Sequence, residues 1–231
     1  MTTTRRKKIL DITREEIKEA AREMMLEKGT AGLSIRAIAR KMEMTAPALY
    51  HYYKNLDELT TALIVDGFSN LADTLAQAAA DPAHQTAGER LYAVGNANRN
   101  WALTHPVDFQ LLYGNPIPGY EQPLDITYPP ARRSFLITAN IFVEALKTSE
   151  LDHYQANIRL SDKLQHSLEQ LTAVDGHRLP QLALYLAAVA WTRLHGHIML
   201  ELFNLIQPVI GDVDAFFDQE LRKFIHEIGL N

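Results

Sequence analysis

Residues 44–55 of the chain are MTAPALYHYYKN, a stretch that crowds three tyrosines, a histidine and a lysine beside a proline. The pattern predicts a short helix over 46–53, because a proline in the first helical turn loses no intrahelical hydrogen bond. The preceding segment predicts another short helix, which Ser34 can cap and which ends near Glu43. Two helices of about eight residues joined by about three are typical of a helix-turn-helix motif, whose second helix enters the major groove of DNA.

Three interpretations of the aromatic residues compete. On a helix, Leu49 and Tyr53 share one side and can pack on the preceding helix. The other rings, Tyr50, His51 and Tyr52, could cover a neighbouring helix and keep their polar ends in water. His51 or a tyrosine could act as an acid or base, but no paired carboxylate or nucleophile lies at a suitable helical spacing. DNA binding is the third interpretation, because tyrosine, histidine and lysine side chains bond phosphate oxygens.

The flanking helices begin at recognisable caps. Thr13 and Glu16 form a capping box, which predicts a first helix over about 14–28. Asn55 and Glu58 form another, which opens a helix after the motif.

Composition and charge narrow the class of protein. The chain has 231 residues, 47% of them hydrophobic, and no cysteine, which excludes disulfides and thiolate sites and favours the cytoplasm. No signal peptide or membrane span is expected. The net charge of −5 is uneven: residues 1–60 hold 12 Lys and Arg against 9 Asp and Glu, and residues 61–231 hold 11 against 19. Residues 1–12 predict a flexible basic arm, whose run Arg5–Lys8 is either a solvated tail or a phosphate-binding segment.

The sequence GLSIRAIARKMEMTAPALYHYYKNLDEL resembles the DNA-binding domain of the tetracycline-repressor (TetR) family, in which an LYxHF-like motif closes the recognition helix. The resemblance implies a helix-turn-helix domain over 1–55 and a helical ligand-binding and dimerisation domain over 56–231. By position it implies these DNA contacts: Ser34, Ile35, Arg36, Thr45, Ala46, Pro47, Tyr50, His51, Tyr52 and Lys54.

Two positions depart from the family pattern. Glu43 occupies a turn where many members have glycine, so a left-handed backbone there would cost roughly 1 kcal/mol. Leu56 occupies a position where members commonly carry a lysine that contacts phosphate. Lys54 and the run Arg5–Lys8 are the available substitutes for that contact.

The rest of the chain predicts helices and no strand, so the expected fold class is all-α. The stretches 115–123 and 128–130 are too rich in proline for a helix interior and predict a loop, and a loop of this length is often functional. The expected helices cover about 57–80, 86–104, 106–113, 129–148, 153–174, 179–206 and 212–228.

The segments NWALTHPVDFQLLYGNPIPGYE and AWTRLHGHIMLEL are similar to one subclass of TetR C-terminal domains, with a Trp and then a His-Gly element. This resemblance implies a small-molecule effector without identifying it. His195 and His197 do not predict a metal site, because residues two apart on a helix point to different sides, and a close helix crossing at Gly196 explains them better. Core packing is the simpler explanation for most of the candidate ligand contacts, which are Trp101, His105, Phe109, Tyr113, Tyr128, Phe135, Phe142, Trp191 and His195.

The last two helices, within about 179–228, carry more apolar surface than one chain is expected to cover, which predicts a homodimer; a single large core is the alternative. A two-fold dimer would set two recognition helices about 34–36 Å apart on a near-palindromic operator. The expected protein is a transcriptional repressor that binds DNA, uses no metal or cofactor, and is released by an effector. Two rivals remain: an all-α enzyme that uses His105 or His195, and an adaptor whose N-terminal part binds another protein.

Overall fold

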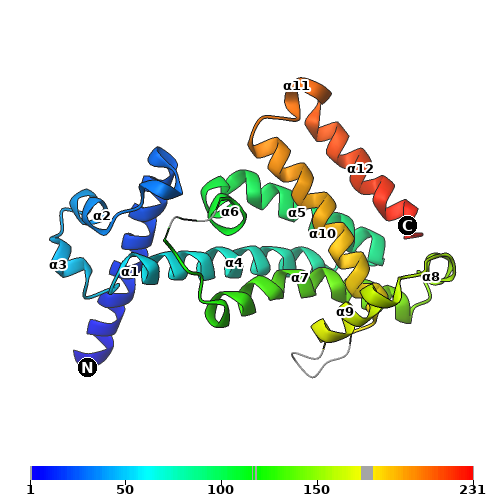
Figure 1. The fold of residues 1–231 in the computed structure, drawn as a ribbon, viewed down its shortest axis with the longest axis horizontal. Coiled ribbons are helices and arrows are strands. Elements are labelled where there is room, and N and C mark those ends of the chain that lie inside the picture. Colours follow the sequence, from blue (N-terminus) through cyan, green and yellow to red (C-terminus); the bar gives the residue numbers. More distant parts are fainter. Residues whose placement is uncertain (1, 116, 118, 173–178, 231) are drawn as a thin grey trace. The chain divides into compact units, whose positions relative to one another are not determined.

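The computed structural model describes residues 2–115, 117, 119–172 and 179–230. Over these ranges the chain forms helices and no strand, which confirms the all-α class. It divides into two compact units, residues 1–69 with 105–130 and residues 70–104 with 131–231 (Figure 1). Two helices cross the boundary between the units, α4 (Leu56–Ala80) and α7 (Leu124–Lys147). None of the described helices is long and apolar enough to span a membrane.

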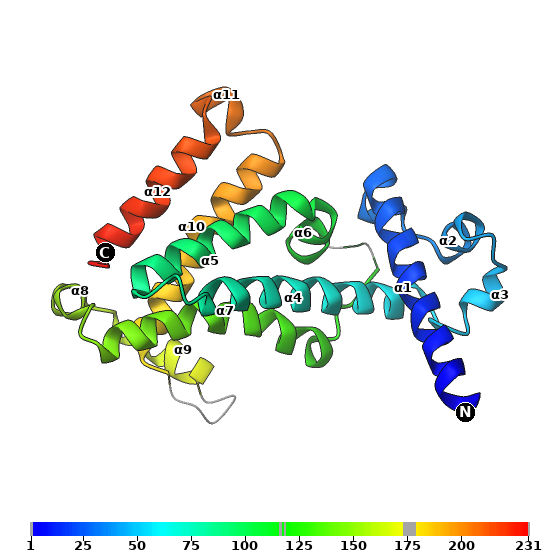
Figure 2. The same cartoon turned by 180° about the vertical axis from the view of Figure 1, so that it is seen from behind.

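The first unit is built on a small hydrophobic core. Ile17 from α1, Ile38 from α2 and Leu49 from α3 are fully buried in it, and Figure 2 shows α2 and α3 beside α1. Each helix buries one apolar stripe, because residues three and four apart lie on the same side. The helices that supply this core are α1 (Thr2–Lys28), α2 (Ile35–Lys41), α3 (Ala46–Leu49) and the beginning of α4. The 3-10 turn η1 (Thr30–Gly32) lies between α1 and α2.

The start of α1 differs from the prediction. The helix begins at Thr2, so the predicted start near Thr13 is wrong, and the segment predicted as a basic arm is helical from Thr2 onward. The segment before Thr13 contains neither glycine nor proline, and nothing in it interrupts a helix. A capping box marks where a helix can begin, but the same residues are tolerated inside a helix that begins earlier.

The second helix of the motif is shorter than predicted, and the turn before it spans residues 42–45. The α-helix α3 ends at Leu49, and residues 50–52 continue as turns rather than as the predicted helix to Tyr53. Glu43 has φ of 55°, which confirms the left-handed residue expected in the turn. Such a conformation crowds a Cβ atom and suits glycine better.

The first unit is completed by α6 (Pro106–Tyr113) and the segment that follows it. Val107 and Leu111 of α6 pack against the core of the helix-turn-helix. Phe109 and Tyr113 pack with ring centroids 5.0 Å apart, and the Tyr120 hydroxyl lies 2.9 Å from the Thr61 hydroxyl of α4. The DNA-binding core is therefore joined by residues well beyond the predicted boundary at 55.

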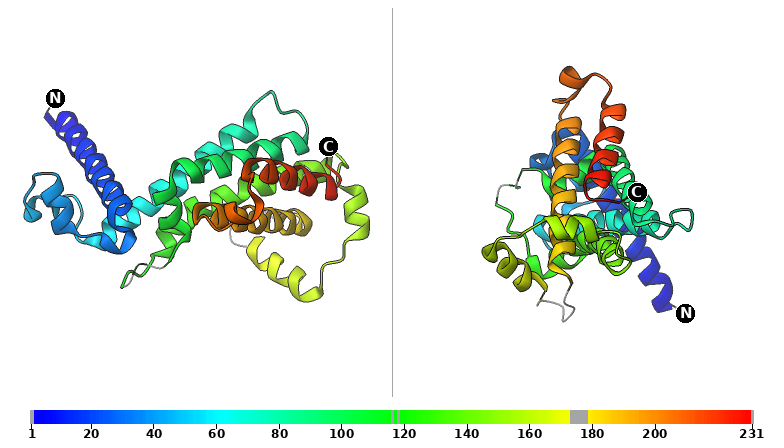
Figure 3. Two further views of the ribbon diagram at one scale, coloured as in Figure 1. Left: turned by 90° about the horizontal axis from the view of Figure 1, so that it is seen from above. Right: turned by 90° about the vertical axis from the view of Figure 1, so that its right-hand side faces the viewer.

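In the second unit, α10 and α12 both pack on α5, and Figure 3 shows α11 at the turn that joins α10 to α12, with the two long helices side by side. Two helices approach closely at Gly95 of α5, where a Cβ would come within 2.8 Å of the Leu221 side chain of α12. The crossing predicted at Gly196 is wrong, because that residue is exposed and faces open space. The helices of this unit are α5 (Ala87–Thr104), α8 (Asp152–Asn157), α9 (Asp162–Thr172), α10 (Gln181–Leu202), α11 (Gln207–Ile210) and α12 (Val213–Glu227).

Two helix predictions in the later part of the chain are also wrong. Pro129 and Pro130 lie inside α7, near its exposed beginning, where carbonyls that lose a partner can turn to water. The helix expected over 153–174 is broken into α8 and α9, because Ser161 caps a new start: its hydroxyl lies 3.4 Å from the amide of Leu164. The predicted end of that helix lies outside the described residues.

Candidate nucleic-acid interface

The helix-turn-helix is held in shape by local caps. The Thr45 hydroxyl accepts a hydrogen bond from the Ala48 amide at 3.3 Å and so caps α3, and Pro47 occupies its first turn. Asn55 caps α4, because its side-chain oxygen lies 2.8 Å from the Glu58 amide, and the Glu58 carboxylate accepts from the Lys54 amide at 2.6 Å. These bonds fix both ends of the segment that carries the aromatic cluster.

The inner side of this segment is as predicted. Leu49 is fully buried and Tyr53 is 5% exposed in the core of the unit. Burial raises the pKa of the Tyr53 hydroxyl, which therefore stays neutral at neutral pH. The Arg14 guanidinium lies 5.9 Å from the Tyr53 ring centroid, within reach of a cation–π contact.

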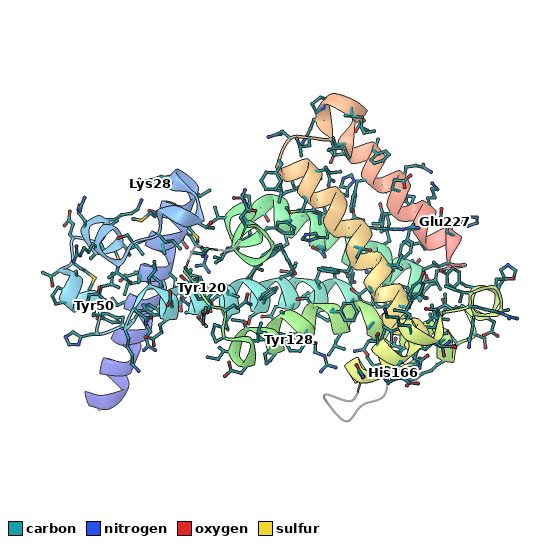
Figure 4. The ribbon with its side chains drawn as sticks, viewed as in Figure 1. Lys28, Tyr50, Tyr120, Tyr128, His166 and Glu227 are labelled. Atoms are coloured by element: carbon teal, nitrogen blue, oxygen red, sulfur yellow. The ribbon has the colours of Figure 1, made fainter. Side chains whose placement is uncertain are left out.

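The outer side carries five exposed residues of the predicted set. These are Thr45, Pro47, Tyr50, His51 and Lys54, and Figure 4 shows the Tyr50 side chain at the edge of α3. Tyr50 is 47% exposed although its ring is large and apolar. An exposed tyrosine hydroxyl can donate a hydrogen bond to a phosphate oxygen, and an exposed lysine can contact the same backbone.

Three of the predicted DNA contacts are placed differently. Ile35 is 6% exposed and belongs to the hydrophobic core, so its side chain is not available to DNA and this prediction is corrected. Ala46 and Tyr52 are partly buried and pack against the same core. Ser34 and Thr45 are the N-cap residues of α2 and α3, and both retain exposed surface. Backbone amides at the start of a helix can donate hydrogen bonds to phosphate.

The cations of the first unit fall into two groups. In the first group, Lys18 pairs with Asp66 and lies 2.8 Å from Glu15. Burial opposes its charge, but the hydrogen bonds to the two carboxylates prevail and raise the pKa of Lys18. Arg22, likewise, donates to Asp108 of α6 at 3.0 and 3.3 Å. These buried pairs hold α1 to α4 and α6.

The second group is exposed and unpaired. Arg36, Arg40 and Lys54 make no ion pair within the described part of the chain. Arg36 and Arg40 are four residues apart on α2, so they share one side of that helix. Lys41 belongs to the paired group, because its ammonium lies 2.9 Å from Glu23 and 3.0 Å from Glu27.

Sequence reasoning missed Arg40 and Arg14. The four-residue spacing from Arg36 could have identified Arg40. No local pattern places Arg14 beside Tyr53, since the two residues belong to different helices. Leu56, where a lysine is common in the family, is partly buried against the core, so Lys54 is the cation at that end of the motif.

The predicted ligand contacts are divided between the units. In the second unit, Trp101 donates to the Asn70 side chain at 2.6 Å, and the rings of Trp191 and His195 lie 5.5 Å apart. Four of the set lie in the first unit, His105, Phe109, Tyr113 and Tyr128, and five in the second, Trp101, Phe135, Phe142, Trp191 and His195.

Several of these residues are core rather than cavity residues. Phe109 and Phe142 are 1% and 0% exposed, whereas Tyr128 and Trp191 are each 44% exposed. Burial raises the pKa of the Tyr113 hydroxyl to about 12. Within the described ranges, no three His, Asp or Glu side chains gather as a metal site would require.

Comparison with known proteins agrees with this geometry. Residues 17–63 match the family described as bacterial regulatory proteins, tetR family, and residues 91–224 match the tetracyclin repressor-like C-terminal domain. The chain is 32% identical over 216 residues to the HTH-type transcriptional regulator Rv1816 of Mycobacterium tuberculosis, covering 91% of this chain and 89% of the relative. The regulator Mb1846 of Mycobacterium bovis matches equally.

Solved structures show the same fold. The crystal structure of SCO4313 superposes with a TM-score of 0.77 at 30% identity, covering 95% of this chain and 98% of that one. A TetR variant from Acinetobacter baumannii in complex with minocycline superposes at 0.53 and 15% identity, covering 93% and 97%. The helix-turn-helix with its exposed cations and the matches along the chain lead to one assignment: this protein belongs to the TetR family of DNA-binding transcriptional regulators.

Proposed function

We propose that this TetR-family regulator is a cytoplasmic repressor that binds a near-palindromic operator as a homodimer and leaves it when a small molecule binds. The observation that carries the DNA-binding surface is the set of unpaired cations and exposed rings on α2 and in the segment that follows α3. Arg36, Lys54 and Tyr50 lie on the exposed side of a motif whose other side is core. Cations without acidic partners are available to phosphate, and each contact releases counterions from DNA.

The proposed dimer rests on apolar surface at the end of the chain. A two-fold dimer buries the same surface patch on both copies. It also presents two DNA-binding domains, as recognition of a palindromic operator requires. The exposed residues that would be covered, in α10, α11 and the turn between them, are Trp191, Leu200, Phe203, Leu205, Val209 and Ile210.

The proposed route from effector to DNA is α4. This helix begins at the end of the DNA-binding motif and continues across the boundary between the two units. Asp66 of α4 pairs with Lys18 and lies 3.9 Å from Arg22 of α1, so a shift of α4 would move the helix that supports the motif. An effector acts only through a difference in its affinity for the two states. The minocycline bound to the TetR variant is a precedent for an effector in this fold.

No enzymatic role is proposed, because the named relatives are transcriptional regulators and the aromatic cluster lacks a nucleophile. The assignment of the C-terminal domain to one subclass of the family, based on Trp191 and the pair His195-Gly196, stays a prediction. The adaptor alternative predicts binding that does not depend steeply on salt, unlike binding to phosphate.

Selection of bound DNA from a random pool tests the proposal. We expect a near-palindrome whose half-sites are read by two copies, with a 2:1 complex in analytical ultracentrifugation. Tyr50→Phe should weaken binding to that operator while leaving the fold intact, because the side chain is exposed. Recovery of a single, non-repeated half-site bound by one chain would contradict the dimer, and recovery of no enriched sequence would contradict the operator.

A further inference from the structure

The side of α3 that faces away from the core carries only aliphatic carbon. Pro47 is exposed and lies two residues before the fully buried Leu49, so the two side chains point to different sides of the helix. Ala46 and Ala48, on either side of Pro47 in the sequence, are partly buried. Alanine and proline side chains contain no hydrogen-bonding atom. The exposed side of α3 is therefore a short apolar surface.

The main chain adds few hydrogen-bond donors to this surface. Proline has no amide N–H. The Ala48 amide donates within the chain to the Thr45 carbonyl at 3.0 Å and to the Thr45 hydroxyl at 3.3 Å, and the Leu49 amide donates to the same carbonyl at 3.2 Å. The Thr45 hydroxyl oxygen is thereby tied to the helix. Much of the hydrogen-bonding capacity of this stretch is used inside the protein.

Long polar side chains lie around this surface rather than on it. Arg36 is on α2, and Tyr50, His51 and Lys54 come after α3 in the chain. All four residues are exposed. Side chains of these types commonly bond phosphate oxygens. Small side chains on α3 allow its main chain to approach base edges closely, while the longer side chains around it reach the DNA backbone.

An aliphatic surface can distinguish one base from the others in the major groove. Every base pair presents hydrogen-bonding groups there, but among the four bases only thymine presents a methyl group, on C5. A proline or alanine side chain cannot pair with the polar edges of guanine, adenine or cytosine, and covering those edges leaves them without partners. Burying the thymine methyl group is favourable, because apolar surface leaves water on both sides.

We propose that α3 selects thymine in each half-site of the operator through its C5-methyl group, which packs against Pro47 with Ala48 beside it. This inference rests on the proposed operator binding and adds the base that α3 recognises. 5-Methylcytosine carries the same methyl group at the same ring position, so it should replace thymine with little loss. The competing explanation is hydrogen bonding to a base by Thr45, whose hydroxyl still has a proton to donate.

The test places four bases in turn at one position of the operator: thymine and uracil opposite adenine, then 5-methylcytosine and cytosine opposite guanine. The position is found first by replacing each thymine of the selected operator singly with uracil. Affinities for the full chain are measured by competition in fluorescence polarisation. Thymine and 5-methylcytosine should bind within about twofold of each other, and uracil and cytosine about fourfold more weakly, because each lacks one buried methyl group. Changing both half-sites should cost about fifteenfold.

Three results would overturn the proposal. Equal affinity for thymine and uracil at every thymine of the operator would show that no methyl group is read. Tight binding of thymine and uracil with losses for both cytosines would show that the pair is read by its hydrogen-bonding groups instead. Selected half-sites without a constant thymine would have the same consequence.

A pair of variants assigns the effect to α3. Pro47→Ala removes Cγ and Cδ from an exposed residue and introduces a good helix former. The preference for thymine over uracil should fall from about fourfold to less than about twofold, whatever the change in overall affinity. Lys54→Ala is the matched control. It should weaken binding to all four duplexes and keep the preference, because a phosphate contact does not depend on the base.

The assignment to Pro47 would be overturned by an unchanged preference in Pro47→Ala. Circular dichroism verifies that this variant is folded, and the base series on the unaltered protein needs no variant at all. The proposed function and this inference can fail separately. If no DNA sequence is enriched, the proposed function fails and the inference falls with it. If a palindrome is enriched and bound but uracil costs nothing, only the inference fails.

Discussion

Arg99 and Arg36 show two opposite ways in which this chain places a cation. Arg99 is 7% exposed, donates to Glu201 and Asp214, and lies with its guanidinium carbon 4.8 Å from the Phe217 ring centroid. These hydrogen bonds, that to Glu201 foremost, raise the pKa of Arg99. Arg36 is exposed and, in the described ranges, makes no ion pair.

The difference follows from the cost of burying charge. A buried guanidinium must be neutralised and hydrogen-bonded, or it loses several kcal/mol of solvation. An exposed one needs no partner for stability, so leaving it unpaired costs the fold nothing. Arg99 therefore serves the fold of the second unit, and the free cations Arg36 and Arg40 of α2 and Lys54 after α3 can serve DNA. Removing a paired, buried cation should therefore lower stability, and removing an unpaired, exposed one should weaken DNA binding.

The largest effect is expected for Arg99→Met. The change leaves the Glu201 carboxylate 8% exposed without its cation, which should lower the free energy of unfolding by about 3–5 kcal/mol. Urea denaturation followed by circular dichroism measures this loss. The double variant Arg99→Met with Glu201→Met should recover most of it, since two apolar side chains leave no charge buried. A single-variant loss below about 1 kcal/mol would show that the pair does not support the unit.

The elements of the first unit were largely predictable because their signals are local. The N-cap position of Ser34, which makes no side-chain capping bond, the capping box at Asn55, the proline at 47 and the left-handed turn at Glu43 depend on a few neighbouring residues. Leu49 and Tyr53 follow from helical spacing alone. The start of α1 was not predictable in this way, because a cap signal does not report that the preceding segment is also helical.

The surroundings of His197 in the second unit were not predictable from the sequence. The only partner that the sequence suggested was His195, two residues away, as half of a metal pair. In the structure the His197 ring lies against Phe216 and Phe217 of α12, with ring centroids 5.9 and 4.9 Å away. Packing between distant segments leaves no local pattern, so no spacing in the sequence indicates this contact.

The next effect concerns the free cations and DNA. Arg36→Ala should weaken operator binding about tenfold and lower the slope of log K against log salt by about 1, if the side chain contacts one phosphate. Lys54→Ala should behave in the same way. Fluorescence polarisation across a potassium chloride series measures both quantities. The free energy of unfolding should not change, and an unchanged salt slope would remove these residues from the interface.

Glu43→Gly should have a smaller effect, and on stability rather than on binding. The residue has φ of 55°, and glycine adopts this conformation without a Cβ clash, although it loses more entropy on folding. The net gain should be about 0.5–1 kcal/mol in urea denaturation. Glu43→Ala is the control, since it removes the charge and keeps the Cβ. A gain from alanine equal to that from glycine would assign the effect to charge instead of backbone conformation.

The smallest effect is expected for two neighbouring residues of α2. They give the most direct test of whether ion-paired and unpaired cations differ in their contribution to DNA binding. Lys41 is held by Glu23 and Glu27, whereas Arg40 beside it is exposed and has no ion-pair partner in the described ranges. Lys41→Ala should change operator affinity by less than about twofold, because a paired cation at the surface offers little net charge to phosphate. Arg40→Ala should weaken binding several-fold and reduce its salt dependence, as a lost phosphate contact does. Equal losses from both changes, in polarisation at matched salt, would mean that DNA responds to the summed charge of the helix and not to which cations are left unpaired.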